Sequence, residues 1–276
     1  MYHLFIPNLP LRPFIECYWI AKSMPSQSNT LYEHVFVDAR ADILFNFGCP
    51  YARTRLDETS SESMGTSNLD TQRTYPVIIQ QTGEIYLIGL RFKPGGLSAF
   101  LPIPIHEISN LTLDIGMMFS ASMMELQSRL YDAASFSQQI ELLNTFFLKR
   151  LNPNAVHPYA NEVARQIEQY GGEINIHALC QQVGYSIRTV DRIFNITYGI
   201  SPKAYARIVR FQRALRQMRQ NPSLNLASVA QNCGYYDQAH FAKDFSALAG
   251  QNADQFRKYL LAKSLAPNLV QILQAP

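Results

Sequence analysis

Two stretches of the sequence decide the fold, LCQQVGYSIRTVDRIFNITYG at residues 179–199 and VAQNCGYYDQAHFAKDFSALAG at residues 229–250. They match at an offset of 50 up to Tyr185 and Tyr235, and at an offset of 51 after one inserted residue. A repeat of this kind indicates that one supersecondary unit occurs twice in the chain.

Each copy has the chemistry of a helix-turn-helix unit. A short helix ends at a glycine, a residue that easily adopts the positive φ of a turn. Ser186 or Asp237 follows and offers a side-chain oxygen that caps the next helix. That second helix is apolar on one face and polar on the other, which is the layout of a DNA-reading head. We therefore expect units at about residues 174–197 and 225–249.

The polar outer faces of the two second helices are the predicted DNA-reading surfaces. The candidate residues are Arg188, Thr189, Asp191 and Arg192 in the first unit, and Gln238, Ala239, Ala242 and Lys243 in the second. An ordinary pair of helical hairpins would show the same apolar spacing. Two copies that both keep the glycine, the cap and a cationic face favour DNA binding.

The segment between the copies predicts a long cationic helix. Pro202 suits a first helical turn, and the apolar pattern continues to Met218, before Asn221 and Pro222. About 17 residues span roughly 25 Å, which with the widths of the units approaches the ~34 Å between successive major grooves on one DNA face. Its cations, with no acid among them, are Lys203, Arg207, Arg210, Arg213, Arg216 and Arg219. We take the first three of these as candidate phosphate contacts.

At these residues the chain resembles the AraC-type family of transcription regulators. The resemblance rests on SIRTVDRIFNITYGISPKAYARIVRFQRAL and LASVAQNCGYYDQAHFAKDFSALAG, followed by Phe256 and Arg257, and covers about 100 residues. It implies tandem units joined by a long helix, second helices in adjacent major grooves, and a DNA contact at His240. The family's proline after the second unit is absent at Ala253, and Lys243 stands where arginine is commoner. Lysine cannot make the bidentate guanine contact.

The first hundred residues predict a small β-barrel or sandwich. Short β-rich runs lie at residues 14–20, 42–47, 76–80 and 84–92, and Thr82-Gly83 predicts a hairpin between the last two. Residues 51–74 are polar and predict a long loop. Helical spacing follows at residues 95–101, 120–131 and 135–151.

The predicted fold class is therefore α+β, with an N-terminal small β-barrel or sandwich, trailing helices, and a C-terminal all-α tandem helix-turn-helix domain. Asn152-Pro153-Asn154 predicts a boundary between a sensor and dimerisation domain at residues 1–151 and a DNA-binding domain at residues 157–262. RPFIE at residues 12–16 and GLRFKPGG at residues 89–96 resemble a domain found before such tails, which implies a barrel-like sensor or dimerisation module.

Charge and cysteine usage narrow the class of protein. Residues 1–150 hold 11 Lys and Arg against 14 Asp and Glu, whereas residues 151–276 hold 13 against 7, so the basic half is the candidate for an anionic partner. The four cysteines form no Cys-x-x-Cys pair, which predicts no metal site and no disulfide framework. No secretory signal or apolar stretch near ~18 residues is visible, so we expect a reduced, cytoplasmic protein with no membrane contact and no cofactor.

Two enzyme-like alternatives to DNA binding lack the residues that they require. A cupin-like enzyme needs clustered histidines, but residues 1–150 offer only His3, His34 and His106, widely spaced. A methyl-accepting repair regulator with a DNA-binding tail would use Cys17 or Cys49, which lack further cysteines around them. We expect no catalytic residues. A pure interaction protein with a borrowed fold is the third alternative, and a salt titration of DNA binding separates it.

The predicted partners are double-stranded DNA and a second copy of the chain. Residues 120–151 carry more apolar side chains than one small barrel can bury, among them Leu143 and Phe147, which predicts a homodimer through this region. A small-molecule effector and RNA polymerase remain open as further partners. The sequence identifies no ligand-binding residues.

Overall fold

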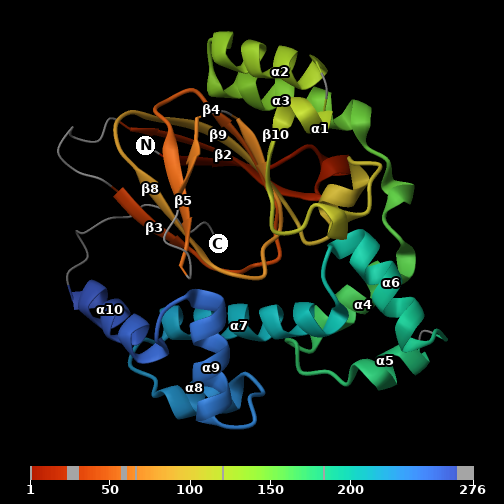
Figure 1. Ribbon diagram of the computed structural model, residues 1–276, viewed down its shortest axis with the longest axis vertical. Coiled ribbons are helices and arrows are strands. Elements are labelled where there is room, and N and C mark those ends of the chain that lie inside the picture. The colour runs from red at the N-terminus through yellow and green to blue at the C-terminus, as the bar shows by residue number, and fades with distance from the viewer. Residues whose placement is uncertain are drawn as a thin grey trace.

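The computed structural model describes residues 2–23, 31–56, 61–65, 67–119, 121–182 and 184–265. Figure 1 shows an N-terminal β-sandwich with α1, α2 and α3 on one side of it and a row of C-terminal helices along another side. The predicted α+β class is confirmed, and the N-terminal part is an open sandwich of two antiparallel sheets instead of a closed barrel.

The two sheets are built from strands that are far apart in the sequence. The first sheet has the order β1-β2-β9-β4-β7-β10, with β1 (Tyr2–Phe5), β2 (Ile15–Ser23), β9 (Ile85–Phe92), β4 (Asp42–Asn46), β7 (Asn68–Asp70) and β10 (Thr112–Asp114). The second has the order β3-β8-β5-β6, with β3 (Leu31–Val35), β8 (Val77–Gln81), β5 (Tyr51–Arg55) and β6 (Ser61–Met64).

Side-chain alternation along β9 explains why the first sheet is covered on both faces. Ile88 and Leu90 pack into the core shared with the helices, and Leu87 belongs to a separate cluster with Trp19. Because successive strand residues point to opposite faces, these two clusters lie on opposite sides of the sheet. A Cβ at Gly89 would lie 1.9 Å from the Trp19 ring, so only glycine fits beneath that indole.

Three helices follow β10 and cover the outer face of the first sheet. They are α1 (Ile115–Phe119), α2 (Ala121–Asp132) and α3 (Phe136–Arg150). Leu143 and Phe147 are fully buried within the chain, as are Met123 and Leu130. Most of the apolar side chains counted as a surplus thus pack within the chain, while Met124 stays 47% exposed. A dimer through this region remains an untested prediction with less apolar surface to support it.

Three local predictions in the N-terminal part were also wrong. Residues 51–74 contain β5, β6 and β7, because Arg53 donates to Asp70 at 2.7 Å and Asn68 donates to the Tyr51 hydroxyl at 3.0 Å across the sandwich. These paired polar side chains concealed the strand pattern. The segments around Thr82-Gly83 form no hairpin, since β8 and β9 belong to different sheets. Residues 95–101 contain only a 3₁₀ helix at Gly96–Ala99.

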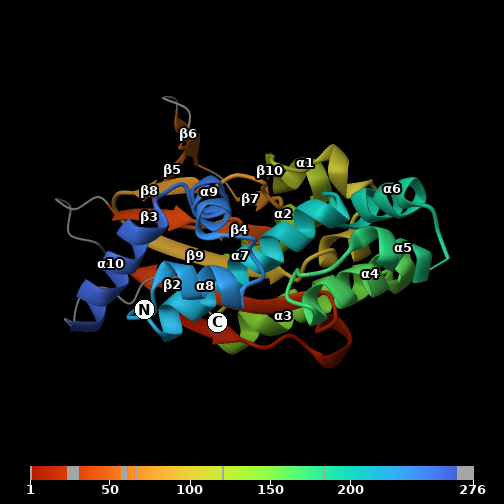
Figure 2. The same cartoon turned by 90° about the horizontal axis from the view of Figure 1, so that it is seen from below.

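The C-terminal part is helical as predicted. Its helices are α4 (Pro158–Gln169), α5 (Ile176–Gln182), α6 (Ile187–Tyr198), α7 (Pro202–Gln220), α8 (Leu226–Asn232), α9 (Gln238–Ala249) and α10 (Ala253–Leu265). In Figures 1 and 2, α7 runs between two groups, α4–α6 at one end and α8–α10 at the other. Within the described ranges, no helix combines the length and the apolar character of a membrane span.

Candidate DNA interface

The first unit consists of α5, a glycine turn and α6. Gly184 has a φ of +75°, and apart from its chain neighbours no atom of the described residues lies within 4 Å of a Cβ built there. Ser186 caps α6, since its side-chain oxygen accepts from the backbone N–H of Thr189 at 3.2 Å. The predicted turn and cap are confirmed, while Val183 in this unit lies outside the described residues.

The two faces of α6 differ as predicted. Val190 and Phe194 are buried, and Phe194 stacks on Tyr198 with 4.2 Å between ring centroids. Arg188 and Arg192 are exposed and lie one helical turn apart. Their guanidinium groups can therefore reach one partner surface together.

The other two candidates on α6 are less accessible to a DNA partner. Thr189 and Asp191 are half-buried. The Thr189 hydroxyl lies 2.9 Å from the Ser186 hydroxyl and so belongs to the cap. The structure thus presents the two arginines as the main polar contacts of this face.

The second unit repeats this geometry with α8, a glycine turn and α9. Gly234 has a φ of +71°, and its predicted left-handed conformation is confirmed. Asp237 caps α9 by accepting from the backbone N–H of His240 at 2.7 Å. Phe241 and Phe245 are fully buried on the inner face of the helix.

The outer face of α9 carries few charges. Gln238, Ala239, His240 and Lys243 are exposed, and Ala242 is half-buried. At the offset of 51, Lys243 corresponds to Arg192, and Asp244 corresponds to Ile193. Asp244 is buried at 6% exposure, and this carboxylate was not among the sequence-predicted residues. The repeat contained the signal, because an acid stands where the first copy has an apolar residue.

Part of the predicted cationic stripe on α7 meets α9. Lys203, Arg207 and Arg210 line a groove of about 520 Å³ together with Ser201, Ala204, His240 and Asp244. Arg207 Nε donates to Asp244 Oδ1 at 2.9 Å. The expectation that the α7 cations lack a counter-charge was therefore wrong for Arg207, because Asp244 of α9 lies beside it.

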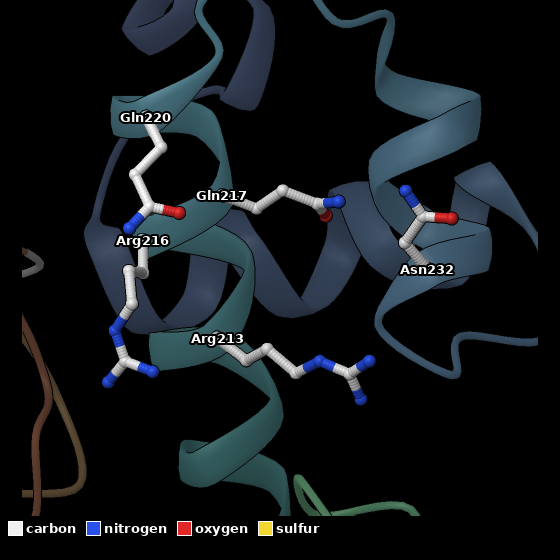
Figure 3. Close-up of a pocket in the computed structure, with 5 residues that line it drawn as sticks. All are labelled: Arg213, Arg216, Gln217, Gln220 and Asn232. Atoms are coloured by element: carbon white, nitrogen blue, oxygen red, sulfur yellow. The ribbon is translucent and has the colours of Figure 1, made fainter.

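The α7 stripe continues into a second polar groove. This groove, of about 420 Å³, is lined by Arg213, Arg216, Gln217, Gln220 and Asn232. Figure 3 shows Gln217 and Arg213 extending from α7 toward the side where Asn232 lies, with Arg216 and Gln220 on the other side of the helix. The Cys233 thiol donates to Gln217 Oε1 at 3.4 Å, which ties α8 to α7.

The N-terminal part contacts the first reading helix at its C-terminal end. Gly199 caps α6 with a φ of +72°, and its carbonyl accepts from the Ser109 hydroxyl at 2.8 Å. Gln72 Nε2 donates to the same hydroxyl at 2.6 Å. A Cβ at Gly199 would lie 1.8 Å from Gln72 Nε2, so this approach requires glycine.

It also contacts the second reading helix at the equivalent end. The Val37 backbone N–H donates to the Leu248 carbonyl at 3.2 Å, and Gln212 Nε2 of α7 donates to the Val37 carbonyl at 2.6 Å. The Val37 side chain is 2% exposed and packs in the core of the C-terminal helices. The β3–β4 connection is therefore part of that core.

Among the described residues, no three His, Cys, Asp or Glu side chains are grouped to hold a metal ion. Cys17 lies half-buried on β2, and burial raises the pKa of its thiol to about 11. A thiol with so high a pKa carries little thiolate at neutral pH, and thiolate is the nucleophilic form.

Each half of the chain is similar to a known protein family. The family described as a helix-turn-helix domain matches residues 179–259, and a family described as a domain of unknown function (DUF6597) matches residues 3–114. The Msm operon regulatory protein of Streptococcus mutans is 28% identical over 120 residues, 42% of this chain and 43% of that protein. The transcriptional activator RhaS of Escherichia coli is 27% identical over 78 residues, 28% of each chain. The chain thus spans less than half the length of these relatives.

ToxT from Vibrio cholerae superposes with a TM-score of 0.49 at 7% identity, covering 88% of this chain and 98% of that chain. The C-terminal domain of AraT from Geobacillus stearothermophilus gives a TM-score of 0.36 at 18% identity, covering 38% and 87%.

The repeated capped units, the helix that joins them and the matched family agree on one assignment. The predicted AraC-type resemblance is confirmed over the C-terminal helices, where the helix-turn-helix family matches residues 179–259.

Proposed function

We propose that this protein is a sequence-specific DNA-binding transcription regulator whose helices α6 and α9 enter adjacent major grooves. The observation that carries the proposal is the pair of capped helices with exposed polar faces at opposite ends of α7. The 19 residues of α7 span about 28 Å at ~1.5 Å each. That length suits two reading heads on one face of a duplex.

The proposed DNA contacts fall into two classes. Base-edge contacts come from the outer faces of α6 and α9, with Arg188 and Arg192 best placed because they are exposed. Phosphate contacts come from Lys203, Arg207 and Arg210 on α7, which fix orientation without reading sequence. DNA in the cytoplasm is the partner for both classes.

The test is DNA selection followed by a salt titration with the full chain. Selection from a random pool should yield a consensus with two half-sites about one helical turn apart. The observed affinity should fall steeply with salt, by a slope of about 0.9 per phosphate neutralised. Arg188→Ala/Arg192→Ala should lose preference in one half-site, whereas Lys149→Ala, an exposed lysine of α3 outside both units and α7, should bind as the wild type does. A pool without enrichment, or binding insensitive to salt, would contradict the proposal.

We also propose that the N-terminal part, residues 1–151, is a sensor and dimerisation domain coupled to DNA binding by residues 157–262. Its hydrogen bonds to the ends of α6 and α9 support the coupling. Charged groups from both sheets support a polar effector between them: Arg91 of β9 donates through Nε to Asp42 of the neighbouring strand β4 at 3.0 Å, and burial raises the pKa of Glu33, on β3 of the other sheet, to about 7.

The homodimer remains a proposal with a different surface. Among the described strands, β1 is an edge strand, and its exposed side chains are apolar, with Leu4 43% exposed and Ile6 just beyond the strand 72% exposed. Exposed apolar edges mark pairing sites. Sedimentation of the wild type as a dimer and of Leu4→Lys/Ile6→Lys as a monomer is the expected result. RNA polymerase is the further partner proposed, because curated relatives are named as activators.

A further inference from the structure

We propose that Asp244 is a positioning and specificity-determining residue of the second unit. Its buried carboxylate holds Arg207 of α7 beside α9, so that the groove between these helices receives one backbone phosphate of DNA in a fixed register. This inference rests on the proposed DNA-binding function and names how one half of that interface is aligned.

The repeat shows that the acid is a departure from the plan of the unit. Ile193 occupies the equivalent place in α6 and is 8% exposed, against 6% for Asp244. An isoleucine is therefore compatible with this position of the unit. A carboxylate is costly at such burial unless it is paired and hydrogen-bonded, so its presence calls for a role other than core packing.

The contacts of Asp244 supply that role. Oδ1 accepts from Arg207 Nε at 2.9 Å. Oδ2 has no hydrogen-bond partner among the described residues, and it lies 3.9 Å from His240 Nε2. One buried oxygen thus fixes a cation of α7, and the other faces a side chain of the reading helix.

Arg207 remains available to an anion while it is held. Its side chain is 38% exposed, and its hydrogen bond to Asp244 uses only Nε. The terminal nitrogens of a guanidinium are the ones that grip phosphate. Asp244 therefore orders Arg207 without occupying the atoms that would bind DNA.

The surroundings favour one phosphate at this place. The groove of about 520 Å³ is lined by three cations of α7, Lys203, Arg207 and Arg210, against the single acid Asp244. Arg210 is itself held over the Tyr235 ring, with 5.4 Å to the ring centroid. The N-terminus of α7, capped by Ser201, adds its positive dipole end.

The sign of the effect distinguishes positioning from simple charge. A negative group beside DNA opposes loose binding to any sequence, because it repels phosphates. If Asp244 also fixes Arg207, its removal weakens binding to the correct sequence but not to other sequences. The quantity that responds is therefore the specificity ratio, the dissociation constant for a scrambled duplex divided by that for the correct sequence.

The experiment compares Asp244→Ile and Asp244→Asn with the wild type, in the full chain, on the selected operator and on a scrambled duplex. Asp244→Ile restores the residue type of the first unit, and thermal unfolding checks that it folds. We expect its specificity ratio to fall about tenfold, as for loss of one charge-assisted hydrogen bond, with scrambled-duplex affinity equal or tighter. Asp244→Asn keeps an acceptor for Arg207 and should retain most of the ratio.

A double-mutant cycle with Arg207→Ala completes the test. Because Asp244 acts through Arg207, Asp244→Ile should change the ratio little once Arg207 is alanine. Tighter binding of Asp244→Ile to both duplexes, or an undiminished effect in the Arg207→Ala background, would overturn the positioning role. Failure of the wild type itself to bind DNA would instead overturn the proposed function, and the inference with it.

Discussion

The two helix-turn-helix units have the same backbone geometry but carry different side chains on the outer faces of their second helices, α6 and α9. Their turn glycines have φ values of +75° and +71°, and both reading helices start at a side-chain cap and end at a left-handed glycine. At the offset of 51, the exposed or half-exposed positions Arg188, Asp191 and Arg192 of α6 correspond to Ala239, Ala242 and Lys243 of α9. The two units thus have the same fold, but the charged side chains on the outer face of α6 are mostly replaced by alanines on α9.

This difference indicates a division of labour. The first unit carries two exposed guanidinium groups on its own reading helix, which suits direct reading of guanine. The second unit has one exposed lysine, Lys243, on its reading helix α9. The other cations beside that helix come from α7, and one of them, Arg207, is hydrogen-bonded to Asp244. We infer that the first unit contributes more base discrimination and the second more backbone positioning.

The largest expected effect concerns how the N-terminal part holds each unit. It meets the first through the Ser109 hydroxyl and the second through Val37, whose side chain is 2% exposed. Val37→Asp would bury an unpaired charge, so we expect a loss of several kcal/mol in unfolding free energy. Ser109→Ala removes the hydroxyl that bonds to the Gly199 and Ile105 carbonyls and to Gln72, and should cost about 1–2 kcal/mol. Thermal unfolding measures both, and equal losses would contradict the asymmetry.

The turn glycines provide the next comparison. A Cβ at Gly234 would lie 2.5 Å from Glu173 Oε2, whereas a Cβ at Gly184 would meet no atom of the described residues beyond its chain neighbours within 4 Å. Both positions have positive φ, which costs a substituted residue roughly 1–2 kcal/mol. We therefore expect Gly184→Val to cost about that much in unfolding free energy and Gly234→Val to cost more, because Glu173 must also move.

Chemical denaturation of the two variants checks this order. A third variant, Gly234→Val with Glu173→Ala, should recover part of the difference, since it removes the obstructing carboxylate. If both single variants lose the same stability, the contact with Glu173 has no energetic weight, and the two turns are equivalent.

Features that depend on neighbouring residues could be predicted from the sequence, whereas features that depend on contacts between distant residues could not. The turn glycines and both caps depend on a few neighbouring residues, and these were predicted correctly from the repeat. The strands within residues 51–74 depend on pairing of Arg53 with Asp70 across the sandwich. Their inner faces are polar, so no apolar alternation marked them.

The missed parts of the site are non-local in the same way. Asp244 meets Arg207 from a position 37 residues away in the chain. Val37 joins the core of the C-terminal helices from a connection between two strands of the sandwich. The apolar excess on α2 and α3 was visible, but its partner, the outer face of the first sheet, could not be identified before the strand order was known.

The reading helices themselves are compared by Arg192→Ala and Lys243→Ala, which stand at equivalent positions. Arginine can bind guanine through two hydrogen bonds, so Arg192→Ala should cost about 1–3 kcal/mol of operator binding and relax the preference at one base. Lys243→Ala should weaken binding less and more uniformly across sequences, because a lysine acts as a point charge. Competition binding against single-base operator variants measures both effects. A larger loss of base preference in Lys243→Ala would reverse the proposed division.

The smallest expected effect compares the two caps. Ser186 accepts from the Thr189 N–H at 3.2 Å, and Asp237 accepts from the His240 N–H at 2.7 Å. Replacing either by alanine should cost about 1 kcal/mol of stability, somewhat more for Asp237 because an anion also interacts with the positive end of the helix dipole. DNA affinity should respond in the opposite order, since Asp237→Ala also removes a negative charge beside the phosphates.

Exchange of the caps, Ser186→Asp and Asp237→Ser, keeps both hydrogen bonds and should leave stability within a few tenths of a kcal/mol. DNA affinity should fall for the first of these variants and rise for the second. If affinity instead follows stability in all four variants, the caps act on DNA binding only through the fold of their helices.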